Sequence, residues 1–115
     1  MSTHADINQI ELSIEQAREK IKLRDQARKL ISNREYKSLI TKGYLTDEAI
    51  RLTSLTGVDS QRDNRSEIFD MLKAISHFQQ YMQRVIREGD MVEQELEDLQ
   101  MTLEELEQEE QNGDA

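Results

Sequence analysis

Apolar residues at heptad spacing in the second half of the chain constrain its fold more than any other feature. With Ile68 at position a, the repeat continues unbroken to Leu106 over six heptads. Eleven of the twelve a and d positions are apolar, and the twelfth is Gly89. Such a repeat keeps one apolar stripe along an α-helix, so it predicts a long helix that packs this stripe against other helices. The a positions are Ile68, Ile75, Met82, Gly89, Leu96 and Leu103, and the d positions are Met71, Phe78, Val85, Val92, Leu99 and Leu106.

The flanking positions divide this helix into two parts. Up to residue 86, the e and g positions include Leu72, Tyr81 and Ile86, which widen the stripe as in a helix packed against several neighbours. From Gly89 onward the e and g positions hold only Glu, Gln and Thr, which leaves the narrow seam of a two-stranded coiled coil. We therefore expect a helical bundle over residues 1–87 and an acidic coiled-coil extension with a tail over residues 88–115.

Gly89 interrupts the apolar seam at the start of this extension. In mid-helix a glycine costs about 1 kcal/mol relative to alanine. Three explanations remain open from the sequence: a close helix crossing, a bend, or a tolerated weak position.

A first amphipathic helix is predicted from about Asp6 to Ile31. Its apolar residues recur at steps of three and four, and a shifted stripe continues them toward the end of the helix. Ser32 and Asn33, whose side chains compete for backbone hydrogen bonds, are expected to end it. The first stripe is Ile7, Ile10, Ile14, Ala17 and Ile21, and the shifted one is Leu23, Ala27, Leu30 and Ile31.

Two short helices are predicted between the long ones. One covers residues 34–42 and ends at Gly43, and the other covers about 47–56 and ends at Gly57, because glycine suits the left-handed position that closes a helix. The polar stretch 59–64 then connects to the last helix. The predicted fold class is all-α: a small bundle of a long helix, two short helices and a long helix, with a C-terminal coiled-coil extension.

Charge is segregated along the chain. Residues 18–42 carry nine basic and three acidic side chains, whereas residues 88–115 carry twelve acids and no base. The acidic end attracts a basic partner and repels anionic surfaces. The basic block could hold nucleic acid, but its acids, the lack of interleaved aromatic residues and the net charge of −9 argue against this. The basic patch considered is Arg18, Lys22, Arg24, Arg28 and Lys29.

The sequence offers no chemistry typical of an enzyme. It has no cysteine, and its two histidines, His4 and His77, are predicted to lie on the surface. No zinc, dinucleotide or P-loop motif occurs, so we expect no catalytic residue, cofactor or metal. No stretch has the length and apolarity of a membrane span or a signal peptide, so we expect a protein of the cytosol with no membrane partner.

Something must cover the seam beyond Gly89. A parallel homodimer would bring Glu88 near Glu93, and a hairpin with the first helix would set the basic end of that helix against residues 64–86. A different protein, or the basic block of another copy, remains. We therefore favour a second chain as the partner, bound by Val92, Leu96, Leu99, Leu103 and Leu106.

Residues 33–52 read N-R-E-Y-K-S-L-I-T-K-G-Y-L-T-D-E-A-I-R-L. This block resembles small, mostly uncharacterised helical proteins of tailed bacteriophages. In these proteins an aromatic-Lys pair precedes an apolar pair, a Gly-Tyr turn and an E-A-x-R-L helix. A later helix carries Ala-Ile-x-x-Phe, as at Ala74, Ile75 and Phe78. The resemblance covers about residues 12–90 and implies phage assembly in the infected cell or the virion.

The sequence thus favours a non-enzymatic interaction protein, a structural or scaffolding-type phage component that oligomerises or docks on a larger phage structural protein through its C-terminal helix. An alternative is an acidic inhibitor that occupies a basic nucleic-acid-binding surface of a host enzyme. A third possibility is a nucleic-acid adaptor that uses residues 18–42.

Overall fold

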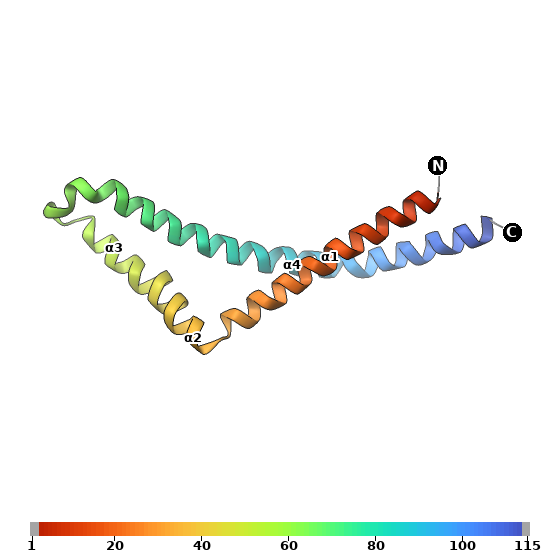
Figure 1. Cartoon of the computed structure of the whole chain (residues 1–115), viewed down its shortest axis with the longest axis horizontal. Helices are drawn as coiled ribbons and strands as arrows, with labels where there is room; N and C mark the ends of the chain where they lie inside the picture. Colours follow the sequence, from red (N-terminus) through yellow and green to blue (C-terminus); the bar gives the residue numbers. More distant parts are fainter. Residues whose placement is uncertain (1–2, 114–115) are drawn as a thin grey trace. The chain divides into compact units, whose positions relative to one another are not determined.

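The computed structural model describes residues 3–113, which contain no β-strand and confirm the all-α prediction (Figure 1). No helix among these residues has both the length and the apolarity to cross a membrane. The elements in order are α1 (Thr3–Ile31), α2 (Arg34–Tyr36), the π-helix η1 (Lys37–Glu48), α3 (Ala49–Leu55), the 3-10 helix η2 (Asp59–Asn64) and α4 (Arg65–Gly113).

α1 ends where the sequence predicts. The hydroxyl of Ser32 donates a hydrogen bond to the carbonyl of Arg28 over 2.9 Å, and Asn33 adopts an extended conformation. The side-chain oxygen of Asn33 accepts a hydrogen bond from the backbone N–H of Tyr36 at 2.9 Å. Asn33 is therefore the N-cap of the next helical segment, and its competition for backbone hydrogen bonds separates the two helices.

The prediction of a helix end at Gly43 is wrong. α2, η1 and α3 follow one another without a break from residue 34 to residue 55. No glycine within residues 3–113 has a positive φ, so neither Gly43 nor Gly57 takes the left-handed conformation that closes a helix. The Thr46 hydroxyl donates to the carbonyl of Thr41 five residues earlier, at 2.9 Å, and does not cap a new helix.

The spacing of apolar residues explains why this segment is a π-helix. Apolar pairs recur at intervals of five, at Leu39-Ile40, Tyr44-Leu45 and Ala49-Ile50. In an α-helix, residues five apart point about 140° away from each other, whereas hydrogen bonds spanning five residues bring them closer to one face. The π-helical stretch thus half-buries one or both members of each pair, namely Ile40, Tyr44, Leu45 and Ala49.

The chain forms two compact units, Met1–Gln26 with Val85–Ala115, and Ala27–Arg84. The sequence places the boundary between 87 and 88, close to the division within α4, but it assigns residues 1–26 to the bundle. In the structure residues 3–26 belong with the C-terminal part of α4.

The unit Ala27–Arg84 has its core where α3 meets the first part of α4. Leu52, Ile68 and Ile75 are buried together, and Leu52 is only 2% exposed. The ring of Tyr44 meets that of Phe78 edge-on, with centroids 6.2 Å apart. Five half-buried side chains pack around this core: Tyr44, Leu45, Ala49, Leu55 and Leu72.

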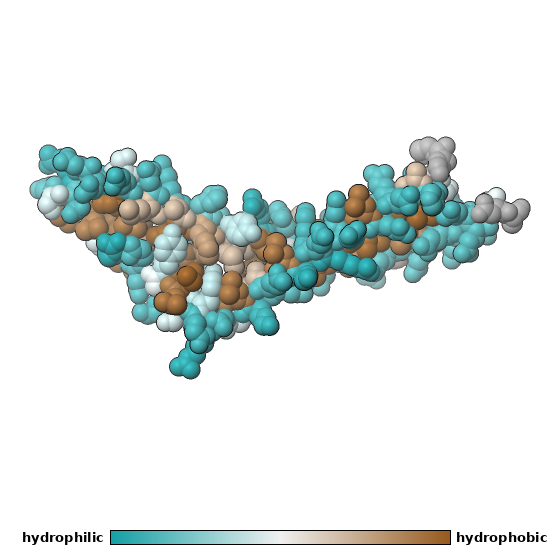
Figure 2. Space-filling model, viewed as in Figure 1, coloured by the Kyte–Doolittle hydropathy of each residue, from teal (hydrophilic) through white to brown (hydrophobic). Residues whose placement is uncertain are grey.

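The unit of residues 3–26 and 85–113 is a two-helix hairpin, built from most of α1 and the C-terminal part of α4 (Figure 1). The two helices run antiparallel, because His4 lies near Glu110 while Arg24 contacts Asp90. In the space-filling view apolar atoms follow the line where these two helices meet, among polar and charged ones (Figure 2).

We predict that Leu52→Ala lowers the free energy of unfolding by about 2–5 kcal/mol, because the substitution leaves a cavity in the core. Leu39→Ala is the matched control, since Leu39 is 71% exposed and its truncation should change stability by less than about 0.5 kcal/mol. Urea denaturation followed by far-UV circular dichroism measures both. Equal effects of the two substitutions would contradict the assigned core.

Candidate interaction site

In the apolar seam of the hairpin, several side chains of α1 are more fully buried than those of α4 that face them. Ile7, Ile14 and Ala17 of α1 are 4–6% exposed. Opposite them, all five residues predicted to bind a partner are only half-buried. These five are Val92, Leu96, Leu99, Leu103 and Leu106.

The helix that packs on the seam of α4 in the structure is therefore not the one that we expected from the sequence. The sequence favoured a second chain, whereas α1 of the same chain lies along residues 85–113. The expectation assumed that the basic end of the first helix would meet residues 64–86. In the structure Leu52 of α3 packs on Ile68 and Ile75 in that stretch, so that part of α4 already has an intrachain partner.

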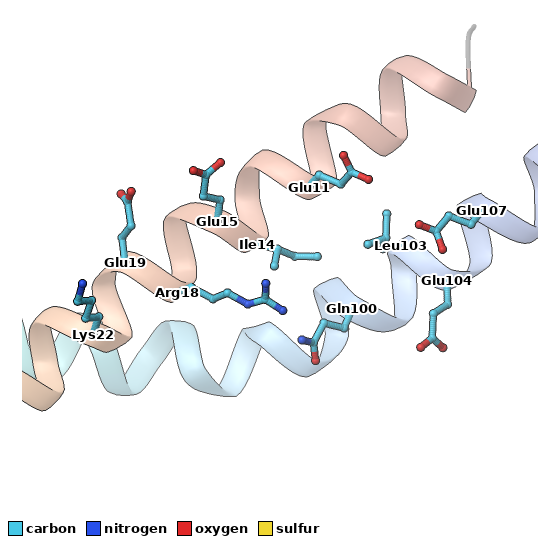
Figure 3. A pocket seen from close by; sticks show the side chains of 10 residues that line it. All are labelled: Glu11, Ile14, Glu15, Arg18, Glu19, Lys22, Gln100, Leu103, Glu104 and Glu107. Atoms are coloured by element: carbon cyan, nitrogen blue, oxygen red, sulfur yellow. The ribbon is translucent and has the colours of Figure 1, made fainter.

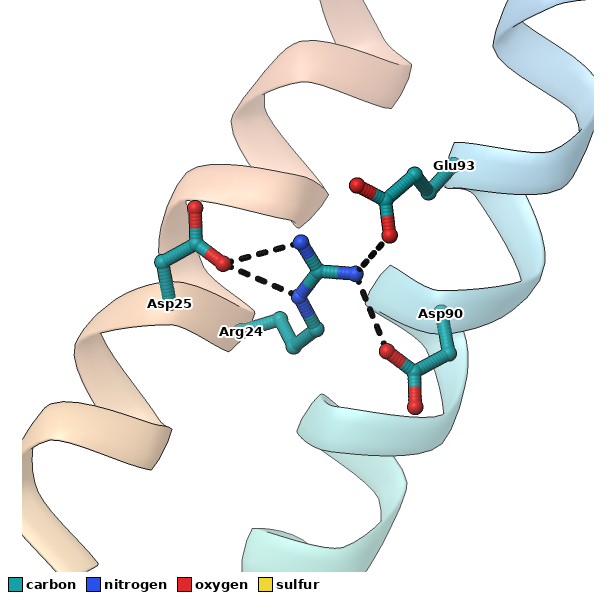
Figure 4. A network of polar contacts seen from close by, with 4 residues as sticks. All are labelled: Arg24, Asp25, Asp90 and Glu93. Carbon is teal, nitrogen blue, oxygen red and sulfur yellow. Dashed lines mark hydrogen bonds and ion pairs between the residues drawn. The ribbon is translucent and has the colours of Figure 1, made fainter. Parts of the chain in front are cut away.

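Arg24 of α1 is the one buried charged residue of the described chain, at 5% exposed. Its Nε and Nη2 donate hydrogen bonds of 3.0 and 2.8 Å to Oδ1 of Asp25 (Figure 4). Its Nη1 donates to Oδ1 of Asp90 at 2.9 Å and also to Glu93. Carboxylates from both helices thus surround one guanidinium, which offsets the cost of removing it from water.

Gly89 makes room for this side chain. A Cβ atom added at Gly89 would lie 2.2 Å from Cβ and 2.8 Å from Cγ of Arg24, closer than real atoms approach. Of the three explanations open from the sequence, the close helix crossing is therefore the one found. Arg24 also continues the α1 stripe of Ile14, Ala17 and Ile21 at heptad spacing, so a large polar residue on one seam faces the one glycine on the other.

The cluster shifts the ionisation of its members. The hydrogen bond from Arg24, and then its charge, hold the pKa of the Glu93 carboxyl below its ordinary value. Conversely, the hydrogen bonds to Glu93 and Asp25 raise the pKa of Arg24 above its ordinary value. Both groups are therefore charged at neutral pH, and the charge-assisted contacts favour the observed register of the two helices.

The predicted basic patch does not form as one surface. Arg24 is buried among carboxylates and offers no free positive face, so its assignment to an exposed patch is wrong. Arg18 and Lys22 are exposed on α1 in the hairpin. Arg28 and Lys29 are also exposed, but they belong to the unit Ala27–Arg84.

Two open grooves flank the seam of the hairpin, and they differ in charge. In the first, Ile14 and Leu103 point toward one another among seven charged residues, and Arg18 extends across toward Gln100 (Figure 3). We call it the charge-rich groove; it is lined by Glu11, Ile14, Glu15, Arg18, Glu19, Lys22, Gln100, Leu103, Glu104 and Glu107.

The second groove, on the other flank, we call the charge-poor groove. Only three of its nine lining residues are charged, and four are apolar. The sequence places Leu23 on the shifted apolar stripe of the first helix, and it is 47% exposed at the edge of this groove. The lining residues are Ser13, Gln16, Ala17, Glu19, Lys20, Leu23, Val92, Glu95 and Leu99.

Comparison with known proteins finds no match to a family model, a curated protein or a solved structure. Within the part of the chain that the structure describes, no three His, Cys, Asp or Glu residues gather in a group that could hold a metal ion.

We predict that Gly89→Ala destabilises the hairpin, although alanine favours helix by about 1 kcal/mol. The added methyl collides with Cβ of Arg24, which cannot move without shifting the helix backbone. Amide hydrogen exchange in residues 3–26 should therefore accelerate. Gly57→Ala is the matched control, since no atom lies within 4 Å of its added Cβ. Unchanged exchange in Gly89→Ala would show that the helices do not cross this closely.

We predict that acid weakens the hairpin through Glu93. Its pKa is lowered on folding, so its stabilising effect is present above the ordinary value of 4.5 and is lost as the pH falls through the folded value. Thermal unfolding between pH 7 and about pH 3 should show a smaller acid-induced drop for Glu93→Gln than for wild type. Glu97→Gln removes a carboxylate of the same helix that Arg24 does not contact, and should keep the wild-type profile. Parallel profiles for wild type and Glu93→Gln would refute this assignment.

Proposed function

We propose that this protein is a non-enzymatic interaction protein that oligomerises or docks on a larger protein through its helical hairpin, as a structural or assembly component of a tailed-phage particle. The observation that carries the interaction role is the half-buried seam. After α1 has packed along α4, the side chains of Val92, Leu96 and Leu99 still reach solvent. Further covering of this apolar surface would release additional free energy.

The chemistry of the hairpin supports binding to a protein. A polar and charged surface surrounds an apolar centre, which is the common anatomy of a protein interface. Leu23 and Met91 are 47% and 55% exposed beside the seam, so apolar atoms extend beyond the two-helix contact itself.

The phage setting rests on the resemblance of residues 33–52. This block forms α2, η1 and the start of α3, where Tyr44, Leu45 and Ala49 pack against the core. The most distinctive residues of the block thus stabilise the fold. Because they are used in this way, we assign contact with a partner to the hairpin.

The alternative of an acidic inhibitor has less support. Such an inhibitor would imitate the phosphates of a nucleic acid, so its carboxylates must be available to contact a basic channel. Asp90 and Glu93 already bind Arg24 of the same chain. Arg18 and Lys22 line the groove that contains Glu104 and Glu107, which further reduces the net charge of this face.

We predict that the chain copurifies with phage particles or their precursors from cells infected by the phage that encodes it. Quantitative mass spectrometry across a density gradient should find it in the particle fractions at a constant ratio to the major capsid or tail protein. A host ribosomal protein is the control for contamination. Recovery of the chain only in the soluble fraction, at every stage of infection, would disprove an assembly role.

A further inference from the structure

The charge-poor groove offers a docking surface whose chemistry matches the chain itself. We propose that a second copy of this chain binds in this groove, giving a symmetric dimer in which two hairpins form an antiparallel four-helix arrangement. The inference rests on the proposed function and deepens it, because it names the partner of the hairpin.

The groove presents apolar atoms that α1 and α4 do not cover for each other. Leu23, at 47% exposed, and the half-buried Val92 and Leu99 line it. Met91 occupies position c of α4 and therefore lies on the same flank of the helix as the g positions that edge the groove. Within residues 3–113 no side chain is less than 2% exposed, so the hairpin has the incomplete core of a structure that is covered further on association.

Charge complementarity favours a second copy over an unrelated helix. Lys20 of α1 and Glu95 of α4 lie in the same groove, and within the described residues the structure records no ion pair for either. A two-fold axis parallel to the hairpin sets α1 of one copy on α4 of the other. Lys20 then faces the partner's Glu95 at nearly the same level, and symmetry repeats the pair.

The other face-to-face arrangement is less favourable. A two-fold axis perpendicular to the hairpin would set α4 on the partner's α4. Residues 88–115 carry twelve acids and no base, so this arrangement would bring like charges together along the contact between the two α4 helices.

The area available suits a stable dimer. The segment of α1 in the hairpin, residues 3–26, is about 36 Å long at 1.5 Å per residue, and two neighbouring helices present a face about 20 Å wide. Such a face covers about 700 Å² per copy, or about 1,400 Å² in total, which lies within the range of specific interfaces.

The first test measures mass in solution by sedimentation and light scattering. Wild type should have twice the chain mass of 13.5 kDa at about 100 µM. Leu23→Glu puts a charge into the groove and should give a monomer. Leu12→Glu is the matched control, because Leu12 is 53% exposed on α1 but does not line this groove, and it should remain dimeric.

A charge exchange then identifies the pairing between chains. Lys20→Glu alone and Glu95→Lys alone should each weaken dimerisation by about tenfold, because each places like charges together twice. Mixing the two variants should restore a heterodimer, since both pairs then join opposite charges. An interaction confined to one chain would gain nothing from mixing. Far-UV circular dichroism of each variant verifies that it is folded.

Three outcomes would overturn the inference: wild type that stays monomeric at about 100 µM, a dimer that persists in Leu23→Glu, or no heterodimer on mixing. The last would show that the two chains do not join Lys20 to the partner's Glu95. Failure here and failure of the proposed function are distinguishable. A monomer that still copurifies with particles removes only the dimer, whereas a dimer absent from all particle fractions removes only the assembly role.

Discussion

The contact of Arg24 with the backbone at Gly89 sets the register on which the hairpin depends. A buried guanidinium is tolerated only where carboxylates meet it, and here Asp25 comes from its own helix while Asp90 and Glu93 come from the other. A slip by one heptad would place Arg24 opposite Met82 or Leu96, where a side chain fills the space that Gly89 leaves open. Apolar stripes alone accept several registers, so this one polar layer selects among them.

α4 can remain one helix of 49 residues because different segments cover its stripe along its length. In the unit Ala27–Arg84, Leu52 of α3 packs on Ile68 and Ile75. In the other unit α1 runs beside residues 85–113. The width of the stripe follows these partners: it is broad where the π-helix and α3 present aromatic and branched side chains, and narrow where a single helix lies alongside.

The predictions from sequence succeeded where a residue acts within its own helix. Asn33 ends α1 through a local hydrogen bond, and the heptads of α4 follow from spacing alone. They failed where tertiary packing decides. Gly43 signals a helix end, but apolar pairs five residues apart make a continuous π-helical stretch the better way to half-bury Tyr44 and Leu45. The five seam residues of α4 were predicted to bind a second chain, whereas in the structure α1 lies along them. Arg24 was assigned to a basic patch, but it is buried. Its role was visible only by aligning the two stripes antiparallel, which brings it opposite Gly89.

Because charge is segregated along the chain, electrostatic interactions between the two helices differ from one end of the hairpin to the other. Near Arg24 the basic block meets Asp90 and Glu93, so opposite charges reinforce the apolar seam. Toward the chain ends, α1 offers Glu11 and Glu15 to a groove that already contains Glu104 and Glu107. There the seam leucines and isoleucines hold the helices together against the mutual repulsion of these carboxylates, and His4 contacts Glu110 near the ends. Opening should therefore begin at the chain ends and stop at the Arg24 cluster.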